Sequence, residues 1–360
     1  MFNKDKRMPV WGLVVTDICL LLVSIGIFML FDYVLPNEKK NSGTVVTDEE
    51  SNSLTDFNMP DTSDYSSTQG DESDSKGTEI TGDFEGSLKN HTTIHATGNT
   101  GTSQFYSDSL TLDFSTLKEE VLKTYKNDNE DLTITKKELG SGNNKITYYV
   151  ADIYVSNVKY LKTAFAEGKY GKNIKETVLD QAKDNNAIFA VSGDFYGNTE
   201  EGIVIRNGKL YRSELNDADT CIIYANGTME TYTSDEYNSD EVIKKGVWQG
   251  FTFGPGLLED GNVKKVFNTT NYLNSRNPRC SIGYVEPGHY IITVADGRNE
   301  GYSKGVTLTE LAEIMANEGC TVAYNLDGGK SASMVFDGEY INKPCDGGRK
   351  VSDIIYIGEW

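Results

Sequence analysis

The stretch that decides the fold is residues 305–334, GVTLTELAEIMANEGCTVAYNLDGGKSASM. Its first half predicts a helix over residues 307–318, because Thr307 and Glu310 have capping-box spacing and a glycine follows the last helical residue. Its second half predicts a buried strand over residues 321–326 that ends at an Asp-Gly-Gly turn. The stretch therefore joins the clearest helix of the sequence to one strand of a sheet.

Outward from this stretch the chain is rich in strand signals. Residues 146–158 (ITYYVADIYVSNV) are β-branched or aromatic and alternate, and residues 280–295 predict two strands around a Pro-Gly turn. Asn-Gly pairs at residues 207–208 and 226–227 are strong hairpin signals. Within the predicted domain, helical spacing recurs over residues 172–185. We therefore expect an α+β fold, with few helices around a mixed central sheet.

The N-terminus predicts a membrane anchor. Residues 1–9 include a basic segment, and residues 10–31 are mostly apolar for long enough to cross a hydrocarbon core. No small-x-small cleavage pattern ends this run, so it is predicted to stay attached as a single transmembrane helix. The positive charges place residues 1–9 in the cytoplasm. The C-terminal domain is therefore expected outside the cell membrane.

Residues 37–109 are predicted to form a disordered linker. The formal net charge is −20, and residues 41–90 alone hold twelve Asp or Glu against two lysines. Few large apolar residues occur here, so the segment cannot bury enough surface to fold. An apolar pattern over residues 110–127 fits a short helix, and the main domain is expected over residues 131–360. The acidity excludes nucleic acid as a partner, since phosphate binding requires a basic surface.

Histidine and cysteine usage limits the metal and redox chemistry. Only three histidines occur, which argues against a multi-histidine metal site, and no CxxC spacing suggests zinc. No cofactor is expected, although a divalent cation bound by carboxylates is compatible with the sequence. Four cysteines outside the predicted anchor fit either disulfides in one of three pairings or buried free thiols: Cys221, Cys280, Cys320 and Cys345.

Two familiar motifs fail on inspection. Residues 329–331 (Gly-Lys-Ser) suggest a P-loop, but Tyr324 stands where that loop needs a glycine, and a hairpin pattern follows where a helix should begin. Residues 301–305 (GYSKG) match a hydrolase nucleophile elbow, but a polar loop precedes them and no histidine follows residue 289.

A set of acidic and basic residues beside glycines remains. Asp-Gly pairs are often plain turns, and we interpret Asp260 and Asp337 in that way. Other members flank longer loops after apolar strands, where functional side chains concentrate. These members are Asp194, Asp296, Asp327, Arg279, Arg298 and Ser331.

At these residues the sequence resembles the phosphodiester glycosidase family. The matching segments are SGDFYG, IVIRNGKL, FTFGPGLL, RCSIGYV, TVADGR, the stretch quoted first, and VSDIIYI. They run in order from about residue 146 to the C-terminus, and NLDGG-x-S is the most specific of them. The family usually has Asn where Ser192 stands and a third glycine where Lys330 stands.

The resemblance implies hydrolysis of a sugar-1-phosphodiester, typically of N-acetylglucosamine, at the anomeric carbon. In this interpretation a carboxylate acts as nucleophile or as base for water, and arginines bind the phosphodiester in bidentate fashion. The implied catalytic residues are Asp327 and Asp194, with Asp296 third. The implied substrate-binding groups are Arg279, Arg298, the loop amides of Gly328 and Gly329, and the Ser331 hydroxyl.

Three functions are carried forward from the sequence. The first is a membrane-anchored, extracytoplasmic phosphodiester glycosidase that acts on a cell-surface polysaccharide or related glycan. The second is a non-catalytic glycan-binding or scaffold module in exopolysaccharide biosynthesis. The third is transfer of the glycosyl group to a polymer in place of water. The expected partners are a carbohydrate or sugar-phosphate substrate and the membrane.

Overall fold

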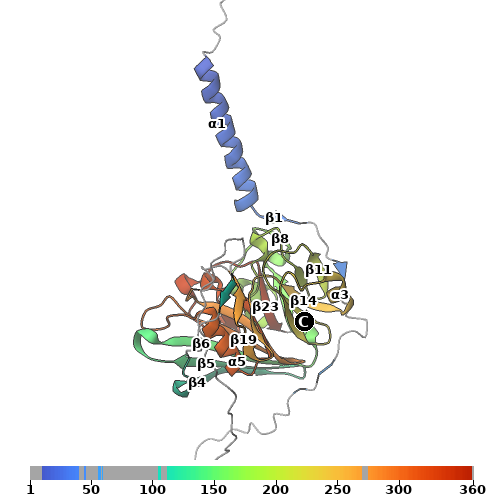
Figure 1. Ribbon diagram of the computed structural model, residues 1–360, viewed down its shortest axis with the longest axis vertical. Helices are drawn as coiled ribbons and strands as arrows, with labels where there is room; N and C mark the ends of the chain where they lie inside the picture. Colours follow the sequence, from blue (N-terminus) through green and yellow to red (C-terminus); the bar gives the residue numbers. More distant parts are fainter. Residues whose placement is uncertain are drawn as a thin grey trace, which may run out of the picture.

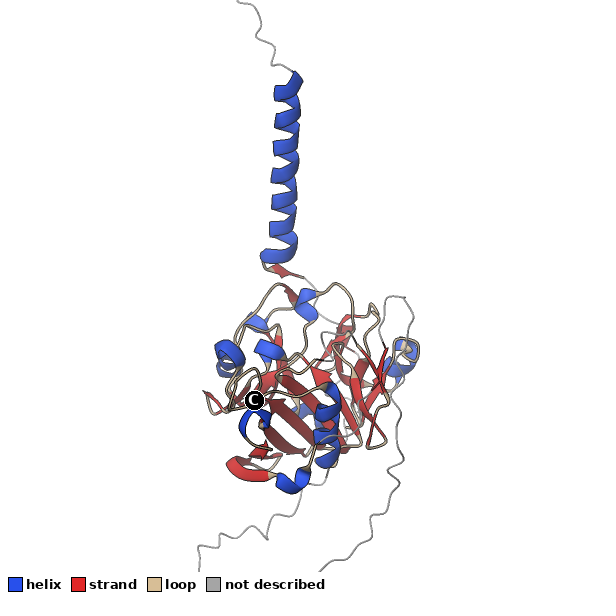
Figure 2. Ribbon diagram, turned by 60° about the vertical axis from the view of Figure 1, so that its left-hand side comes forward, coloured by secondary structure: helices blue, strands red, loops and turns tan. Residues whose placement is uncertain are grey.

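Three antiparallel β-sheets form the folded part of the computed structural model (Figure 1). The structure describes residues 10–39, 44–45, 56–57, 59, 104–106, 112–269 and 275–358. Every strand pair within these residues is antiparallel. The predicted α+β class is confirmed, with mostly strands and few helices (Figure 2). The expected mixed sheet is wrong in strand direction, because tight hairpins join many successive strands.

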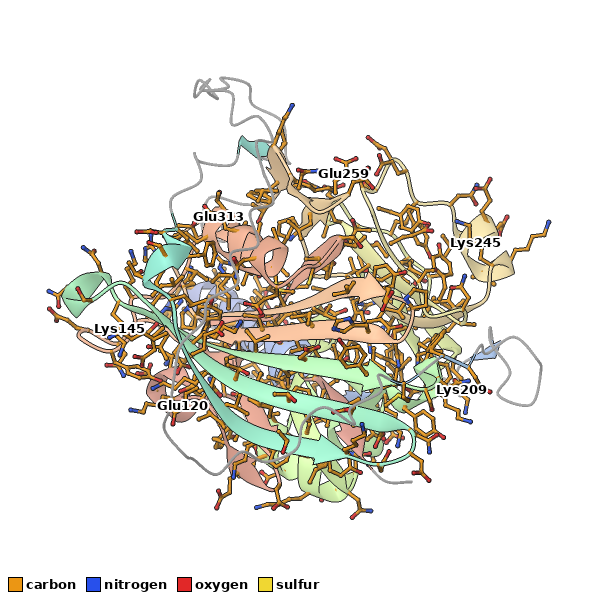
Figure 3. The ribbon with its side chains drawn as sticks, turned by 90° about the horizontal axis from the view of Figure 1, so that it is seen from below. Glu120, Lys145, Lys209, Lys245, Glu259 and Glu313 are labelled. Atoms are coloured by element: carbon orange, nitrogen blue, oxygen red, sulfur yellow. The ribbon has the colours of Figure 1, made fainter. Side chains whose placement is uncertain are left out.

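The largest sheet has eight strands and crosses the lower part of the molecule. Seen from below, β4, β5, β6 and β19 lie side by side, with Glu120 at the free edge (Figure 3). In sheet order the strands are β16 (Asn262–Val263), β15 (Gly256–Glu259), β20 (Val322–Leu326), β18 (Arg279–Glu286), β19 (His289–Ala295), β6 (Ile146–Val155), β5 (Glu130–Leu139) and β4 (Lys118–Lys126).

Two smaller sheets and two short strand pairs complete the β-structure. The six-stranded sheet runs β13 (Met229–Tyr232), β12 (Thr220–Tyr224), β14 (Val247–Phe251), β10 (Val204–Arg206), β11 (Lys209–Arg212), β2 (Thr44–Val45). The five-stranded sheet runs β22 (Glu339–Tyr340), β21 (Met334–Phe336), β9 (Ala187–Ser192), β23 (Asp353–Gly358), β7 (Lys162–Phe165). The pairs are β1 (Asn37–Glu38) with β8 (Gly171–Lys172), and β3 (Gln104–Tyr106) with β17 (Val266–Asn268).

The core lies between the sheets. The side chains of β6 point alternately into two apolar clusters. Tyr149, Ala151 and Ile153 face the main core, which also contains buried residues of the other two sheets. The intervening Tyr148 and Val150 face a second core beneath the helix α5 (Leu308–Asn317). Successive strand residues point to opposite faces, so a strand buried on both sides needs large apolar residues at nearly every position.

The remaining α-helices are α1 (Val10–Met29), α2 (Val178–Asp184) and α3 (Ser239–Lys244).

The strongest local signals are confirmed. Helix α5 begins with the predicted capping box between Thr307 and Glu310. The Asn207-Gly208 turn joins β10 to β11, and both turn residues have positive φ, as this hairpin turn requires. The hairpin of β18 and β19 also forms where the sequence predicts it.

The helix expected within residues 110–127 is a prediction that the structure overturns. Residues 118–126 form β4, which pairs with β5 along its length, so the domain begins before residue 131. A register shift between Val121 and Lys123 places Leu122 and Tyr125 against the core, three residues apart. That bulge produces a helix-like spacing within a strand.

Parts of the predicted linker lie on the domain. Strands β1 and β2 pair with β8 and β11, and β3 pairs with β17. The Phe57 amide donates to the Ser156 carbonyl at 2.6 Å, and its ring packs against the main core. At these positions the expectation of a disordered linker over residues 37–109 is wrong, because short strands pair with the domain and the Phe57 ring packs against its core. The remainder of that prediction lies outside the described residues.

The predicted anchor coincides with α1, which projects from the folded part and is followed by a π-helical turn, Leu30–Val34 (Figure 1). Within the residues that the structure describes, no helix has both the length and the apolar character needed to cross a membrane.

Candidate active site

Asp327 lies where the largest sheet meets the five-stranded sheet. It directly follows β20, and its amide donates to the Gly193 carbonyl, just past β9, at 3.2 Å. The Ser192 hydroxyl donates to the Asp327 carbonyl at 3.1 Å. These bonds join the ends of two strands from different sheets. The Asp327 side chain is only 5% exposed at this junction.

Ser331 and Arg349 bind the Asp327 carboxylate. The Ser331 hydroxyl donates to Oδ2 at 2.6 Å, and Arg349 Nη2 donates to Oδ1 and Oδ2 at 2.8 and 3.0 Å. Arg349 Nε also donates to the Ser331 hydroxyl at 2.5 Å. Burial nevertheless raises the pKa of Asp327 to about 6, because the charged form loses more hydration than these partners replace.

Arg349 forms the outer part of this cluster, and sequence reasoning missed it. Its side chain is 43% exposed, while Asp327 beneath it is buried. The guanidinium lies 5.5 Å from the centre of the Phe195 ring, which contacts Phe253 edge-on at 6.2 Å between centroids. A buried carboxylate, an accessible guanidinium and two half-buried aromatic rings therefore adjoin one another.

Lys175 is a second cation that sequence reasoning missed. It is half-buried, and its ammonium group donates to Asn198 in the turn Tyr196–Asn198. Burial lowers its pKa, the charge of Arg349 lowers it further, and Asp327 opposes both. The site therefore has two neighbouring cations beside one carboxylate, an arrangement that favours an anionic ligand.

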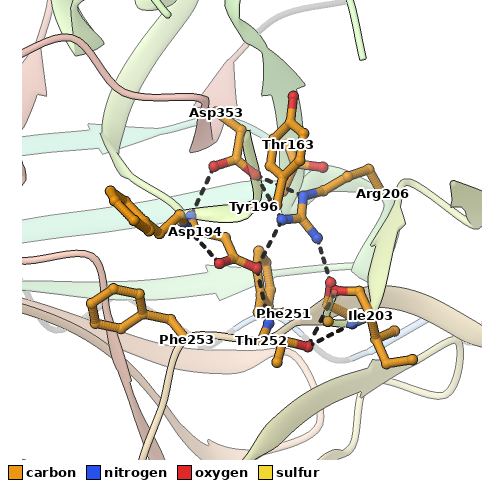
Figure 4. Close-up of polar contacts among 12 residues, drawn as sticks. Thr163, Asp194, Tyr196, Ile203, Arg206, Phe251, Thr252, Phe253 and Asp353 are labelled. Atoms are coloured by element: carbon orange, nitrogen blue, oxygen red, sulfur yellow. Dashed lines mark hydrogen bonds and ion pairs between the residues drawn. The ribbon is translucent and has the colours of Figure 1, made fainter. Parts of the chain in front are cut away.

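Asp194 takes part in a buried ion-pair network with Arg206 and Asp353 (Figure 4). Arg206 Nη2 lies 3.3 Å from Asp194 Oδ2 and 2.7 Å from Asp353 Oδ2. Asp353 Oδ1 accepts from the Asp194 amide at 2.8 Å, and Asp194 Oδ2 accepts from the Thr252 amide at 2.8 Å. The guanidinium also lies 4.5 Å from the centre of the Phe251 ring.

This network ties strand ends together next to Asp327. Asp194 follows β9, Arg206 ends β10 and Asp353 begins β23. Burial raises the pKa of Asp353 to about 6, and the negative charge of Asp194 contributes to the raised pKa of Asp327. Arg206 and Asp353 both occur in segments that resemble the family, IVIRNGKL and VSDIIYI, and that was the available signal for them.

Asp296 is bound by a different set of donors from those that hold Asp194 and Asp327. Its oxygens accept from the Asn342 amide group at 2.8 Å, the Lys343 backbone at 3.0 Å and the Tyr302 hydroxyl at 2.9 Å. Asn342 in turn donates to the Ala332 carbonyl at 3.0 Å. The third catalytic candidate is therefore linked through Asn342 to the segment that follows Ser331.

The predicted substrate-binding groups differ in their surroundings. Arg279 is buried and donates to the carbonyls of Ser275 and Val306 at 2.6 and 3.3 Å, which joins β18 to two neighbouring segments. The Gly329 amide donates to the Pro278 carbonyl at 2.8 Å, so this amide is already hydrogen-bonded within the protein.

Gly328 and Arg298 have different roles in the same loop. A Cβ on Gly328 would lie 2.8 Å from the Pro278 carbonyl oxygen, so this close approach requires glycine. Arg298 is exposed and bonds Asn277 Oδ1 at 2.6 Å, and its Nη2 lies 3.7 Å from the position of a Cβ on Gly329. Arg298 thus lies beside the Asp-Gly-Gly loop.

The structure also bears on the two rejected motifs and on metal binding. Residues Gly329–Ser331 form a single 3₁₀ turn, and Ser303 is buried with its hydroxyl on the Asp296 carbonyl at 2.7 Å. Across the described residues, no three His, Cys, Asp or Glu side chains gather where they could hold a metal ion. The cysteines are free thiols.

Residues 185–358 match the family model of the phosphodiester glycosidases. These residues carry the sequence pattern of a phosphodiester glycosidase domain. The matched range contains Asp194, Arg206, Asp327, Arg349 and Asp353, so both carboxylate clusters lie within the family domain.

Relatives and solved structures agree with this assignment. The chain is 30% identical over 260 residues to the SPbeta prophage-derived uncharacterized protein YomE of Bacillus subtilis (strain 168), covering 66% of this chain and 40% of that protein. It is 34% identical over 185 residues to N-acetylglucosamine-1-phosphodiester alpha-N-acetylglucosaminidase of Homo sapiens, covering 45% and 33% of the two chains. It therefore spans less than half the length of these relatives.

The fold has also been solved. The catalytic domain of the zebrafish N-acetylglucosamine-1-phosphodiester alpha-N-acetylglucosaminidase, auto-inhibited by its pro-peptide, superposes with a TM-score of 0.52 at 18% identity, covering 68% of this chain and 89% of that one. A hypothetical protein from Synechocystis gives a TM-score of 0.50 at 13% identity, covering 66% and 63%. These likenesses show a shared fold.

Proposed function

We propose that the phosphodiester glycosidase domain of this protein hydrolyses a sugar-1-phosphodiester, with an N-acetylglucosamine-type sugar. The observation that carries the proposal is the buried Asp327 carboxylate beneath the exposed Arg349 guanidinium, with Lys175 nearby. A carboxylate next to paired cations suits a substrate with an electrophilic anomeric carbon bonded to an anionic phosphate.

The chemistry follows from the charges. As the bond from the anomeric carbon to the phosphate oxygen breaks, positive charge develops on the sugar and negative charge on the phosphate. Asp327 is placed to stabilise the first, as nucleophile or as base for the attacking water. Arg349 and Lys175 are placed to stabilise the second, since a guanidinium binds phosphate oxygens in bidentate fashion. The phosphomonoester leaves readily, so the reaction depends little on a general acid.

Two further features support this orientation. The half-buried rings of Phe195 and Phe253 offer an apolar surface on which the sugar ring can lie. The pKa of Asp327, about 6, leaves the carboxylate ionised at neutral pH and close to the operating range of a general base.

The test is release of free sugar from UDP-N-acetylglucosamine by the full chain and by two variants. Asp327→Asn should lower turnover by at least about 100-fold, because general-base catalysis alone contributes about 10²–10⁴-fold. The matched control Asp337→Asn, at the exposed turn of the β21–β22 hairpin, should leave turnover unchanged. A fully active Asp327→Asn protein would move the reaction to another carboxylate, and glycan binding without turnover would favour the scaffold module.

We also propose, from the sequence, that the protein is held at the cell membrane with its domain outside, where a cell-surface polysaccharide is the substrate. The supporting feature is the apolar run over residues 10–31. Fractionation of cells that produce the full chain or a variant lacking residues 1–36 tests this. Recovery of both proteins in the same soluble fraction would contradict the proposal.

A further inference from the structure

A cavity of about 230 Å³, which Asp327 does not line, lies beside aromatic side chains of β7, β11, the residue before β8 and the turn Tyr196–Asn198. Two tyrosines, two cations and two carboxylates line it: Tyr170, Tyr211, Lys39, Arg212, Glu200 and Glu214.

The aromatic wall of the cavity is a packed cluster. The Tyr170 and Tyr196 rings stack with centroids 5.4 Å apart, and Tyr211 lies 5.1 Å from Tyr170. Phe165 supports Tyr211 edge-on at 4.9 Å. The half-buried Tyr211 ring is held by the buried rings around it, so it loses little conformational freedom when a ligand binds. The wall is thus formed before any ligand arrives.

The charged side chains that line the cavity are also held in place by hydrogen bonds. Arg212 is buried, and its guanidinium donates to the carbonyls of Gly202 and Thr199 at 2.6 and 2.7 Å. Lys39 follows β1, donates its amide to the Tyr170 carbonyl at 3.1 Å, and pairs with Glu200 at 2.5 Å. The segment after α1 therefore completes the cavity.

The charges of the six lining residues cancel, since Lys39 and Arg212 balance Glu200 and Glu214. The neighbouring Lys172 pairs with Glu200 at 3.2 Å, so that carboxylate holds both lysines. The lining itself therefore favours neither an anion nor a cation. The volume is below the roughly 300–1,000 Å³ of pockets for drug-sized ligands, so the cavity suits a ligand of about one ring. Aromatic rings beside cationic donors and carboxylate acceptors are complementary to a sugar, which has an apolar ring face and a hydroxyl edge.

We infer that this cavity is a second saccharide site, which takes one neutral hexopyranose unit. The segment 194–202 runs from the candidate active site to this cavity. Tyr196 lies two residues after Asp194, and its ring centre is 5.8 Å from the Arg206 guanidinium. The inference rests on the proposed function in one respect, namely that the substrate belongs to a longer glycan. A neutral unit of that glycan would bind here while its phosphodiester-linked unit reacts at Asp327.

Saturation-transfer NMR on the full chain tests the inference directly. The probes are the methyl glycosides of glucose, galactose, mannose and N-acetylglucosamine, with glucuronate as the charged comparison. At least one neutral glycoside should bind, in the millimolar range expected of a small site, and glucuronate should bind more weakly.

Four variants locate the site. Tyr211→Ala should weaken binding about three- to tenfold, as expected for loss of one aromatic contact, while Tyr211→Phe keeps the ring and the binding. Tyr340→Ala, at an exposed tyrosine on β22, and Asp327→Asn should bind as the parent does. Absence of binding by every neutral glycoside, or binding that Tyr211→Ala leaves unchanged or Asp327→Asn abolishes, would overturn the inference. Failure of sugar release in the UDP-N-acetylglucosamine assay would contradict the proposed function alone.

Discussion

Asp194 and Asp327 each lie just past the end of a strand, yet their surroundings differ. The oxygens of Asp194 are bound by Arg206 and by the backbone amides of Phe195 and Thr252. Asp327 is bound by a serine hydroxyl and by a guanidinium that reaches solvent. A carboxylate enclosed by buried donors fixes structure, whereas one beneath an accessible cation can meet a substrate. This difference makes Asp327 the principal catalytic candidate.

The raised pKa of Asp327 predicts opposite pH dependences for activity and for stability. Its pKa rises from 3.8 to about 6 on folding, so the native state holds a proton that the unfolded state has released. As pH rises through this window the free energy of unfolding should therefore fall, and Asp353 contributes with the same sign. Over the same window kcat/KM should rise, because the ionised carboxylate is the active form.

Urea unfolding and initial rates, measured at several values between pH 4 and pH 7, check both trends. In Asp327→Asn the stability should change less steeply with pH. A kcat/KM that is constant from pH 4 to pH 7 would show that Asp327 does not titrate in the rate-limiting step.

Arg349 and Arg279 predict a contrast between two conservative substitutions. Arg349→Lys keeps the charge and loses the planar fork, so turnover should fall at least about tenfold with little change in melting temperature. Arg279→Lys should lower the melting temperature instead, because its bonds to Ser275 and Val306 are buried. Turnover and thermal unfolding measured on both proteins separate the roles. Loss of turnover in Arg279→Lys alone, at unchanged stability, would return the phosphate to Arg279.

At the scale of elements, the site depends on the meeting of strand ends from all three sheets. Strand β20 of the largest sheet, β10 of the six-stranded sheet, and β9 and β23 of the five-stranded sheet end or begin here. Arg206 binds Asp194 and Asp353 and thereby joins the two smaller sheets. The buried network is thus a structural support for the neighbouring Asp327.

Removal of the cation from this network should destabilise the protein strongly. Arg206→Met leaves two buried carboxylates without their partner, which we expect to lower the free energy of unfolding by about 3–5 kcal/mol. Arg206→Lys retains a charge and should lose less. Urea denaturation of the two variants and the parent provides the measurement. A loss below about 1 kcal/mol for Arg206→Met would mean that the carboxylates become neutral at little cost.

At the scale of the whole molecule, the segment before the domain contributes to the folded structure. Phe57 packs over two hairpin turns, since a Cβ on Gly227 or Gly288 would lie within 2.3 or 2.6 Å of its ring atoms. Only glycine at those turns leaves room for the ring. Lys39 and the backbone of β1 lie on the domain in the same way, at the edge of the tyrosine-lined cavity.

Deletion of residues 41–90 should therefore lower the melting temperature, although the composition of this segment suggests no effect. Phe57→Ala should reproduce much of the loss, about 1–3 kcal/mol, since the ring is partly buried and full burial of phenylalanine is worth more. Leu215→Ala, at an exposed position, is the matched control and should change little. An unchanged melting temperature after the deletion would show that Phe57 does not stabilise the domain.

The sequence by itself determines the local elements of this protein and the family of its domain. The capping box of α5, the turn at Asn207 and Gly208, and the alternation of β6 each depend on neighbours within a few residues. Such features are set by backbone geometry and by burial of one face. The segment NLDGG-x-S also makes Asp327 a candidate, because an acidic residue that follows an apolar strand and precedes two glycines lies on a loop at a strand end.

Only the tertiary structure decides which charged side chains meet. Arg349 lies 22 residues from Asp327 and Asp353 lies 159 residues from Asp194, and no periodicity in the chain relates them. Arg279 and Arg298 have equally suggestive sequence contexts, yet one is buried on carbonyls and the other lies beside the loop. The physical reason is that ion pairing and desolvation depend on distance through space, which antiparallel sheets set by bringing remote strand ends together.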